Sequence, residues 1–259
     1  MYDLAASDLH PLHPQNLLVK YADDTYFFIA ASSSNLADQE IDHINGWAKA
    51  NNLQLNFKKC AEIIFRPKSK SRIFNTAFLI DNVPLLNSGI PRLSEIKVLG
   101  VTLTDTLSFA PHLKNIITKA SPSLFALKTL KSHGLQGANL HYVCTAYLYN
   151  QLTYAIPSWR GFANSEDLAR LQKVLNRATR WGLHGGTTLS SLLALADKSD
   201  KALFKKLVND PAHPMHALLP PERSLSVSLR QRTHNFQLSV ETTLSRKNFI
   251  PRMLFNDIY

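Results

Sequence analysis

The spacing of apolar residues changes near Pro111, and this change constrains the fold more than any other feature of the sequence. Before Pro111, apolar residues occur in short runs or alternate with polar ones, as in segments 17–30 and 96–103. After it they recur every three or four residues, starting with Leu113 and Ile116. A period of two is typical of strands and a period near 3.6 of helices. The sequence therefore predicts an α+β fold, with paired strands up to about residue 110 and helices beyond it.

Composition and cysteine usage exclude several classes of protein. Only 9 of 259 residues are glycine, which disfavours a turn-rich β-sandwich. The two cysteines, Cys60 and Cys144, form no CxxC pair, so we expect no disulfide partner for either and no cysteine-based zinc finger. The longest uncharged stretch, 132–159, contains asparagine, histidine and glutamine and is too polar to cross a bilayer. We expect a soluble intracellular protein, nuclear or cytoplasmic, with no membrane partner.

Charge is distributed unevenly along the chain. The formal total is +10, but residues 1–57 carry a net charge of −5 and residues 58–259 a net charge of +15. An acidic N-terminal part followed by a basic body suits a metal site beside a surface that binds phosphates. A basic surface that is merely solvated explains the same charge equally well.

Two adjacent aspartates, Asp23 and Asp24, separate two apolar, aromatic-rich arms in the segment 17–30, LLVKYADDTYFFIA. This pattern predicts a β-hairpin with the acidic pair at or beside its turn. Carboxylates held this close repel each other unless a cation lies beside them, and Mg²⁺ prefers such hard oxygen ligands. Two such ions can clamp the attacking and leaving oxygens of a phosphoryl displacement. We interpret the pair as candidate catalytic metal ligands; the alternative is an acidic surface turn.

Three further segments have clear patterns. Residues 35–51 are predicted to form a helix capped by Ser34 or Asn35. Segment 96–103 is predicted to be a strand with Gly100 inside it, hence a bulge or a close backbone approach. In the helical half, Pro122 is expected to kink or break a helix.

A long amphipathic helix is predicted over residues 164–181, capped by Asn164 or Ser165. Its leucines face one side. Four basic residues occupy the remaining arc: Arg170, Lys173, Arg177 and Arg180. They are candidates for contacts to a nucleic-acid backbone; the alternative is the solvent face of an amphipathic helix.

Tyr21-Ala22-Asp23-Asp24 resembles the YxDD motif of reverse transcriptases, in the YADD form of non-LTR (LINE-type) retrotransposons. Segment 53–60, LQLNFKKC, resembles the next palm motif with its LNxxK core. The pair Leu99-Gly100 resembles the hairpin that grips the primer, and segment 154–180 resembles the helical thumb. Members of this family are RNA-directed DNA polymerases that use two metal ions for nucleotidyl transfer.

The resemblance implies roles for individual residues. Asp23 and Asp24 would hold Mg²⁺, and Lys59, or its neighbour Lys58, would act on the leaving pyrophosphate. Lys58 would also contact the nucleic-acid backbone. The residues that would contact nucleotide or primer are Tyr21, Ala22, Leu99 and Gly100. An RNA template and a DNA primer are the implied partners.

The resemblance also implies an organisation in three parts: 1–110 as the C-terminal part of a polymerase palm, 111–186 as a helical thumb-like region, and 187–259 as a helical C-terminal tail. The family's palm carries a further metal-binding aspartate and a nucleotide-binding motif upstream of YADD, and 20 residues before Tyr21 are too few for both. We expect a truncated reverse transcriptase that is inactive alone. The alternatives are a non-catalytic nucleic-acid-binding remnant and a degraded reading frame. Palm strands left uncovered would favour self-association.

Overall fold

The structure is a computed structural model that describes residues 6–66, 83–185, 190–223, 234–238 and 242–256. Contacts divide the chain into two compact units. The first comprises Met1–Ile96 with Thr104–Thr106, and the second comprises Lys97–Leu103 with Leu107–Tyr259. Across the described ranges, no helix is both long enough and apolar enough to span a bilayer.

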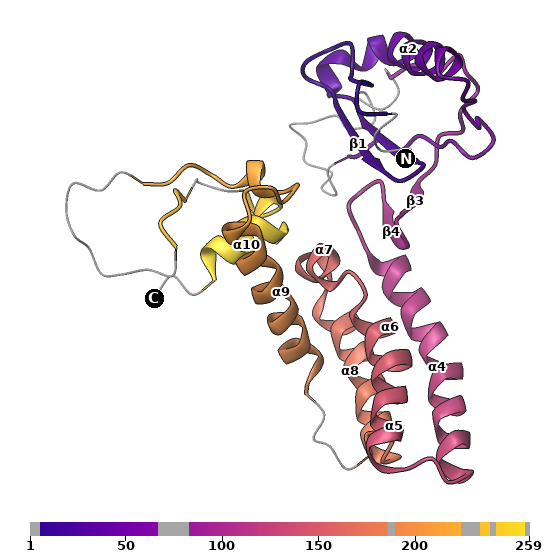
Figure 1. Ribbon diagram of the computed structural model, residues 1–259, viewed down its shortest axis with the longest axis vertical. Coiled ribbons are helices and arrows are strands. Elements are labelled where there is room, and N and C mark those ends of the chain that lie inside the picture. Colours follow the sequence, from indigo (N-terminus) through magenta and orange to yellow (C-terminus); the bar gives the residue numbers. More distant parts are fainter. Residues whose placement is uncertain (1–5, 67–82, 186–189, 224–233, 239–241, 257–259) are drawn as a thin grey trace. The chain divides into compact units, whose positions relative to one another are not determined.

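The first unit contains the predicted hairpin, which is confirmed. Strand β1 (Leu17–Tyr21) pairs antiparallel with β2 (Asp24–Phe28) (Figure 1). The register places Leu17 opposite Phe28 and Tyr21 opposite Asp24. Two residues, Ala22 and Asp23, are left for the turn, so the acidic pair lies at the tip of the hairpin.

Helix α2 (Ala37–Ala50) lies within the range predicted for it, but its cap is different. Neither Ser34 nor Asn35 caps it, because a 3₁₀ turn, η1 (Ala31–Leu36), leads directly into the helix. The N-cap is Leu36, whose apolar side chain cannot accept a hydrogen bond from the first turn of the helix. The preceding turn of helix already supplies the entry geometry, so a capping side chain is dispensable here.

Buried Glu40 of α2 holds the N-terminal segment in place. Its carboxylate accepts hydrogen bonds from the backbone N–H groups of Leu12 at 2.9 Å and His13 at 3.0 Å. It also accepts one from Asn16 Nδ2 at 2.9 Å. Asn16 Oδ1 in turn accepts the backbone N–H of Ala30 at 3.1 Å. This polar node joins α2 to the residues just before and just after the hairpin.

The predicted single strand over 96–103 is wrong in one respect. The segment forms two short strands, β3 (Glu95–Val98) and β4 (Val101–Thr104), in a two-stranded sheet. Leu99 and Gly100 form the turn between them, with φ of +45° and +87°. Positive φ at two consecutive residues is what a two-residue hairpin turn requires. The glycine therefore marks a reversal of the chain rather than a bulge, and a hairpin at Leu99-Gly100 is what the resemblance implied.

The second unit is helical, as the change of period predicts. Its helices and shorter turns, in chain order, are α4 (Ala110–Ser132), α5 (Gly137–Cys144), a π-helical turn (Thr145–Tyr149), α6 (Asn150–Thr153), α7 (Ile156–Trp159), η3 (Arg160–Phe162), α8 (Ser165–Arg180), α9 (Leu192–Asn209), η4 (His216–Leu218), η5 (Ser245–Lys247) and α10 (Phe249–Phe255). After residue 130, the described residues contain one isolated bridge, Glu222 to Phe236, and no strand.

Helix α4 passes through Pro122 without a break, contrary to one of the two expectations for that residue. Proline removes the hydrogen bond to the carbonyl four residues earlier, but Pro122 is exposed, so water can satisfy that carbonyl. Ala120 and Leu124, on either side of the proline, are almost fully buried and hold the helix against the core.

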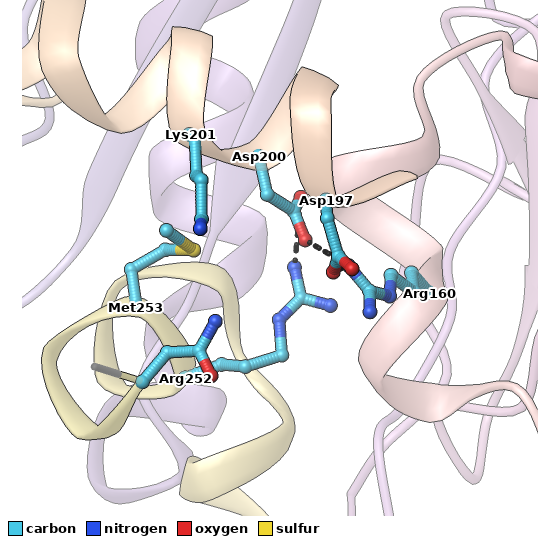
Figure 2. Close-up of a pocket in the computed structure, with 7 residues that line it drawn as sticks. Arg160, Asp197, Asp200, Lys201, Arg252 and Met253 are labelled. Carbon is cyan, nitrogen blue, oxygen red and sulfur yellow. Dashed lines mark hydrogen bonds and ion pairs between the residues drawn. The ribbon is translucent and has the colours of Figure 1, made fainter. Parts of the chain in front are cut away.

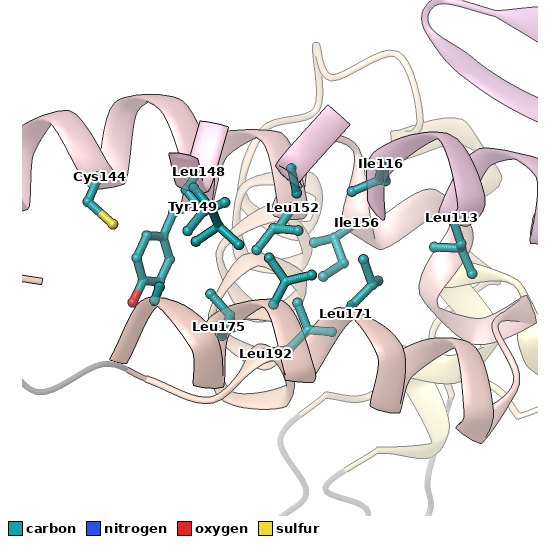
Figure 3. Close-up of a cluster of buried hydrophobic side chains, with 14 of the residues drawn as sticks. Leu113, Ile116, Cys144, Leu148, Tyr149, Leu152, Ile156, Leu171, Leu175 and Leu192 are labelled. Carbon is teal, nitrogen blue, oxygen red and sulfur yellow. The ribbon is translucent and has the colours of Figure 1, made fainter. Parts of the chain in front are cut away.

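The core of the second unit is a layer of leucine and isoleucine side chains between α4, the α5–α6 segment and α8 (Figure 3). Leu113 and Ile116 come from α4, Leu152 from α6, and Leu171 and Leu175 from α8. Full burial of one such side chain contributes roughly 1.5–3 kcal/mol. This layer therefore fixes the helices that carry the basic residues described below.

Candidate nucleic-acid and metal site

Asp23 and Asp24 lie at the exposed tip of the β1–β2 hairpin. Asp24 opens β2 opposite Tyr21, and its Oδ2 accepts a long hydrogen bond, 3.4 Å, from Tyr26 Oη. In the described part of the chain, no hydrogen bond or ion pair involves Asp23. Two neighbouring carboxylates are thus presented to solvent with most of their acceptor capacity unused.

The pair fits Mg²⁺ as part of a ligand set. Carboxylate oxygens are the ligands this ion prefers, and it commonly takes one or two of them together with waters or phosphates. Among the described residues, however, no group of three or more His, Cys, Asp or Glu side chains is placed to hold a metal ion. The hairpin tip therefore supplies two carboxylates and no third.

One face of the hairpin is held and the other is exposed. On the held face, Lys20 Nζ donates hydrogen bonds to the carbonyl oxygens of Ala6 and Leu9, the latter at 2.8 Å. The opposite face carries Tyr21, which is 62% exposed. The apolar residues exposed beside it are Leu17, Val19 and Phe28. Within the described residues, nothing covers this face, so an aromatic ring lies exposed next to Asp24.

The Leu99-Gly100 turn is fixed by Tyr154, which follows α6. Tyr154 Oη donates a hydrogen bond to the carbonyl oxygen of Leu99 at 2.8 Å. A Cβ added to Gly100 would lie 3.2 Å from Tyr154 Cε1, so the ring lies directly against the turn. Val101, the next residue, is buried in the core of the helical unit. Leu99 and Gly100 are both exposed, so the tip of the turn faces solvent.

Backbone strain coincides with three of the motifs. Five non-glycine residues of the described chain have positive φ, and three of them are Ala22, Leu99 and Ala155. Ala22 belongs to the YADD segment, Leu99 to the Leu99-Gly100 pair, and Ala155 to segment 154–180, and the resemblance rests on these three. The left-handed conformation costs a non-glycine residue roughly 1–2 kcal/mol, and such strain concentrates at functional sites. At Ala22 and Leu99 the positive φ is the geometry of a two-residue hairpin turn, and it is compatible with a role of these turns as sites.

Lys58 and Lys59 lie in a turn after Phe57, and both side chains are exposed. The backbone N–H of Lys59 donates to the carbonyl oxygen of Asn56 at 2.9 Å, which shapes the turn. No hydrogen bond or ion pair joins either lysine to the aspartates in the parts of the chain that are described. Their action on a leaving pyrophosphate stays a prediction.

Helix α8 is confirmed, with Asn164 as its cap: the Asn164 side chain accepts the backbone N–H of Asp167 at 2.7 Å. All four predicted basic residues are exposed: Arg170, Lys173, Arg177 and Arg180. Arg170 pairs with Glu166 at 2.6 Å. Over the described ranges, no ion pair involves Lys173, Arg177 or Arg180. These three residues therefore form a basic stripe that keeps its full positive charge.

A cavity of about 410 Å³ in the helical unit contains a buried ion-pair network (Figure 2). Asp200 of α9 accepts hydrogen bonds from Arg160 at 2.8 Å and from Arg252 of α10 at 3.2 Å. Burial raises the pKa of Asp200 despite these two cations, and burial lowers the pKa of Arg252. Asp197 also pairs with Arg160, at 2.6 Å. Because two aspartates already engage the two arginines, the network ties elements together rather than offering an anion site.

Sequence reasoning named Tyr154 only as part of a thumb-like motif and did not include it among the site residues. Its position before Ala155 is a weak signal, but nothing in the sequence shows that its hydroxyl reaches a carbonyl 55 residues away. Phe125 was missed as well. It stands beside Leu124 on α4 and is 70% exposed, so its helical phase alone separates it from the buried face.

Comparisons with known proteins agree with this picture at a coarse level. The chain is 26% identical over 200 residues to a protein of Drosophila melanogaster described as a probable RNA-directed DNA polymerase from transposon BS. The match covers 70% of this chain and 20% of that protein. No family model matches the chain, and no solved structure matches it. The distant homology supports a reverse-transcriptase-like origin.

Proposed function

We propose that this chain is a C-terminal part of the reverse transcriptase of a non-LTR (LINE-type) retrotransposon, comprising the last part of the palm and the thumb-like helices after it. The observation that carries the proposal is the YADD hairpin, which presents Asp23 and Asp24 at an exposed, strained turn. The distant homology to a transposon RNA-directed DNA polymerase supports it. So does the second exposed turn, at Leu99 and Gly100.

In this proposal, Asp23 and Asp24 hold Mg²⁺, which supplies charge neutralisation on the phosphates during nucleotidyl transfer. Tyr21 and Ala22 lie against the incoming nucleotide. The exposed turn at Leu99 and Gly100 contacts the DNA primer, which is paired with an RNA template. Lys59, with Lys58 beside it, neutralises charge on the departing pyrophosphate or donates a proton to it. These residues position and stabilise the phosphates.

Catalysis with two metal ions requires more carboxylates than the described residues place at the hairpin tip. We propose that a further carboxylate, from outside the described residues, completes the site. The chain by itself then binds divalent metal weakly and does not extend a primer. This inactivity follows because two-metal catalysis needs both ions held, and the described residues offer no further carboxylate at the hairpin tip to hold the second one.

The metal site is tested first, with the full chain and Mn²⁺ as a paramagnetic probe. We expect Mn²⁺ to broaden the amide NMR signals of residues 21–25 selectively, and we expect the double variant Asp23→Asn, Asp24→Asn to abolish the effect. The matched control is Asp42→Asn, which removes an exposed carboxylate from α2 and should leave the broadening unchanged. Broadening that persists in the double variant would contradict the proposal.

Polymerase chemistry is tested in a chimera. The segment of the Drosophila polymerase that matches this chain is replaced by the chain itself, and incorporation of nucleotides is measured on a primed RNA template. We expect incorporation by the chimera, none by the chain alone, and loss in the Asp23→Asn chimera. Incorporation that survives Asp23→Asn would show that this residue is not a metal ligand.

A second function, non-catalytic binding of nucleic acid, is favoured by one specific observation. Lys173, Arg177 and Arg180 form an exposed stripe on α8 with no ion-pair partner in the described chain. Such a stripe binds phosphates whether or not the hairpin catalyses anything. Salt-dependent binding without metal-dependent broadening at the hairpin would favour this second function over the first.

A further inference from the structure

Phe125 lies on the outer side of α4, where an apolar ring needs an explanation. It is 70% exposed, whereas its neighbours Leu124 and Leu127 are almost fully buried. The same side of α4, by helical spacing, carries Lys114, Ser121 and Lys128. An exposed phenylalanine among lysines is poorly suited to a dry protein interface, because the charges would have to be desolvated.

Helices α4 and α8 run side by side in the same direction. At one end the Phe109 ring lies 5.3 Å from the Phe162 ring, centroid to centroid. At the other, the Lys128 ammonium lies 5.2 Å from the centroid of the Trp181 ring. Each pair is separated by 53 residues in sequence, so the helices keep a constant register. This register places Phe125 level with residues 177 and 178 of α8.

Helical phase brings the basic stripe of α8 to the same rim. Trp181 faces α4, and Arg177, four residues earlier, is only about 40° around the helix from it. Lys131 Nζ also reaches this end of α8 and donates to the carbonyl oxygen of Trp181 at 2.8 Å. Lys173 and Arg180 lie about 80° and 100° from Trp181, on the outer face of α8 that continues from this side. Phe125 and Lys128 of α4 therefore border the same outward face as Lys173, Arg177 and Arg180. We call these five residues the α4–α8 rim.

Acidic residues are nearly absent around this rim. Residues 106–165 contain no aspartate or glutamate, and neither do residues 168–196. The two acids between these stretches, Glu166 and Asp167, lie at the far end of α8 and pair with Arg170. The rim therefore keeps an uncompensated positive potential, which complements a polyanion rather than another basic surface.

We propose that the α4–α8 rim binds single-stranded nucleic acid, with Phe125 stacking on a base and Lys173, Arg177 and Arg180 contacting phosphates. A ring standing beside a row of cations matches the way proteins bind single strands, by stacking on an aromatic side chain along a basic track. A duplex offers no free base face to Phe125. The inference rests on the nucleic-acid-binding part of the proposed function and not on its chemistry.

The experiment measures fluorescence anisotropy of a labelled oligothymidylate with the full chain at several salt concentrations. We expect Phe125→Ala to weaken binding about tenfold, as expected for one lost stacking contact, without changing the salt dependence. Phe125→Trp should retain binding. The same strand with abasic sites should bind the wild type and Phe125→Ala equally, because it offers no base to stack. The matched control is Tyr142→Ala, which removes an equally exposed ring from α5 and should change nothing.

The charge part is tested by reversing Lys173, Arg177 and Arg180 to Glu. With about 0.7 counterions released per phosphate contact on a single strand, the log–log salt slope should fall by about two. An unchanged slope would overturn the phosphate contacts. Equal binding of wild type and Phe125→Ala to the intact strand would overturn the stacking. Tighter binding of a duplex, or a wild-type dimer in sedimentation that Phe125→Ala disrupts, would overturn the single-strand assignment.

Failure of this inference and failure of the proposed polymerase function give different results. If Mn²⁺ does not broaden the hairpin signals but anisotropy depends on Phe125, the palm assignment fails and the rim stands. If the broadening appears and Phe125→Ala binds the strand as tightly as the wild type, the proposed rim site is wrong and the palm assignment stands.

Discussion

The hydroxyl group of Tyr154 donates a hydrogen bond to the carbonyl oxygen of Leu99 at 2.8 Å, across 55 residues of sequence. The backbone carbonyl oxygen of Tyr154 accepts a hydrogen bond from Trp159 Nε1, also at 2.8 Å, and Trp159 is completely buried. Tyr154 therefore attaches the Leu99-Gly100 turn to the helical core, next to Val101, which is itself buried in that core. In the proposed function, that attachment sets where the turn meets a primer.

Tyr154→Phe should loosen the turn without unfolding the helices. The substitution removes one hydrogen bond and keeps the ring, so we expect a loss of about 1 kcal/mol. Amide hydrogen exchange within residues 98–101 should accelerate about fivefold, while exchange in α8 stays unchanged. The control is Tyr147→Phe, which removes an exposed hydroxyl that makes no hydrogen bond in the described chain. Unchanged exchange in Tyr154→Phe would show that packing alone holds the turn.

Gly100→Ala and Gly46→Ala should have opposite effects on stability. Gly100 has a φ of +87°, and a Cβ there meets Tyr154 Cε1 at 3.2 Å, so we expect a loss of about 1–2 kcal/mol. Gly46 lies within α2 with nothing within 4 Å of an added Cβ, so alanine should stabilise by about 0.5–1 kcal/mol. Urea unfolding measures both. A stabilising Gly100→Ala would contradict the turn geometry.

Sequence reasoning located the elements whose signal is local. The hairpin around Asp23 and the helix capped by Asn164 were predicted because alternation, turn residues and caps lie within a few positions of one another. The helical half followed from periodicity in the same way. Two details were misjudged from the residue patterns: the cap of α2 and the two-strand form of segment 96–103. Both depend on how one short element leads into the next.

Long-range polar contacts had no sequence signal. Glu40 lies within the predicted helix 35–51, yet its side chain is fully buried and accepts hydrogen bonds from residues 24 to 28 positions earlier. The contact of Tyr154 with Leu99 is of the same kind. Such contacts depend on which surfaces meet after folding, and periodicity does not encode this.

Glu40 should make the stability of the first unit dependent on acid pH. Burial raises its pKa, but the hydrogen bonds from Leu12, Asn16 and His13 outweigh burial, and the pKa is lowered from its ordinary value. A lowered folded-state pKa gives stability that is present above the unfolded value of about 4.3 and lost as pH falls through the folded one. Glu40→Gln should therefore cost about 2 kcal/mol at neutral pH and progressively less as pH falls below about 4. Urea unfolding of the wild type and Glu40→Gln at neutral pH and below about pH 4 tests this prediction, with Asp42→Asn as the exposed control. A stability difference between wild type and Glu40→Gln that does not change with pH would contradict it.

Asp200→Asn should destabilise the helical unit more than Asp197→Asn. Removing the Asp200 charge leaves Arg252 buried without its anion, and two of its guanidinium nitrogens, Nε and Nη1, already lack partners among the described residues. Breaking a buried pair in this way costs about 3 kcal/mol. The Asp197 side chain is 47% exposed, so its loss should cost less than about 1 kcal/mol. Thermal unfolding of the two variants compares them directly, and equal losses would contradict the larger role given to Asp200.

The exposed face of the β1–β2 hairpin should drive self-association. Leu17, Val19 and Phe28 are 56%, 42% and 50% exposed on a two-stranded ribbon, and a hairpin of this size is marginal in water unless something packs on it. Exposed apolar strands recruit another chain, so we expect the protein to self-associate at tens of micromolar in sedimentation velocity. Val19→Thr with Phe28→Thr keeps β-propensity while removing apolar surface, and it should shift the chain to monomer with little change in far-UV circular dichroism. The control is Leu193→Thr, which removes a comparably exposed leucine from α9 and should leave association unchanged. A wild-type chain that sediments as a monomer at this concentration would contradict the prediction, because the exposed face would then be stable in water alone.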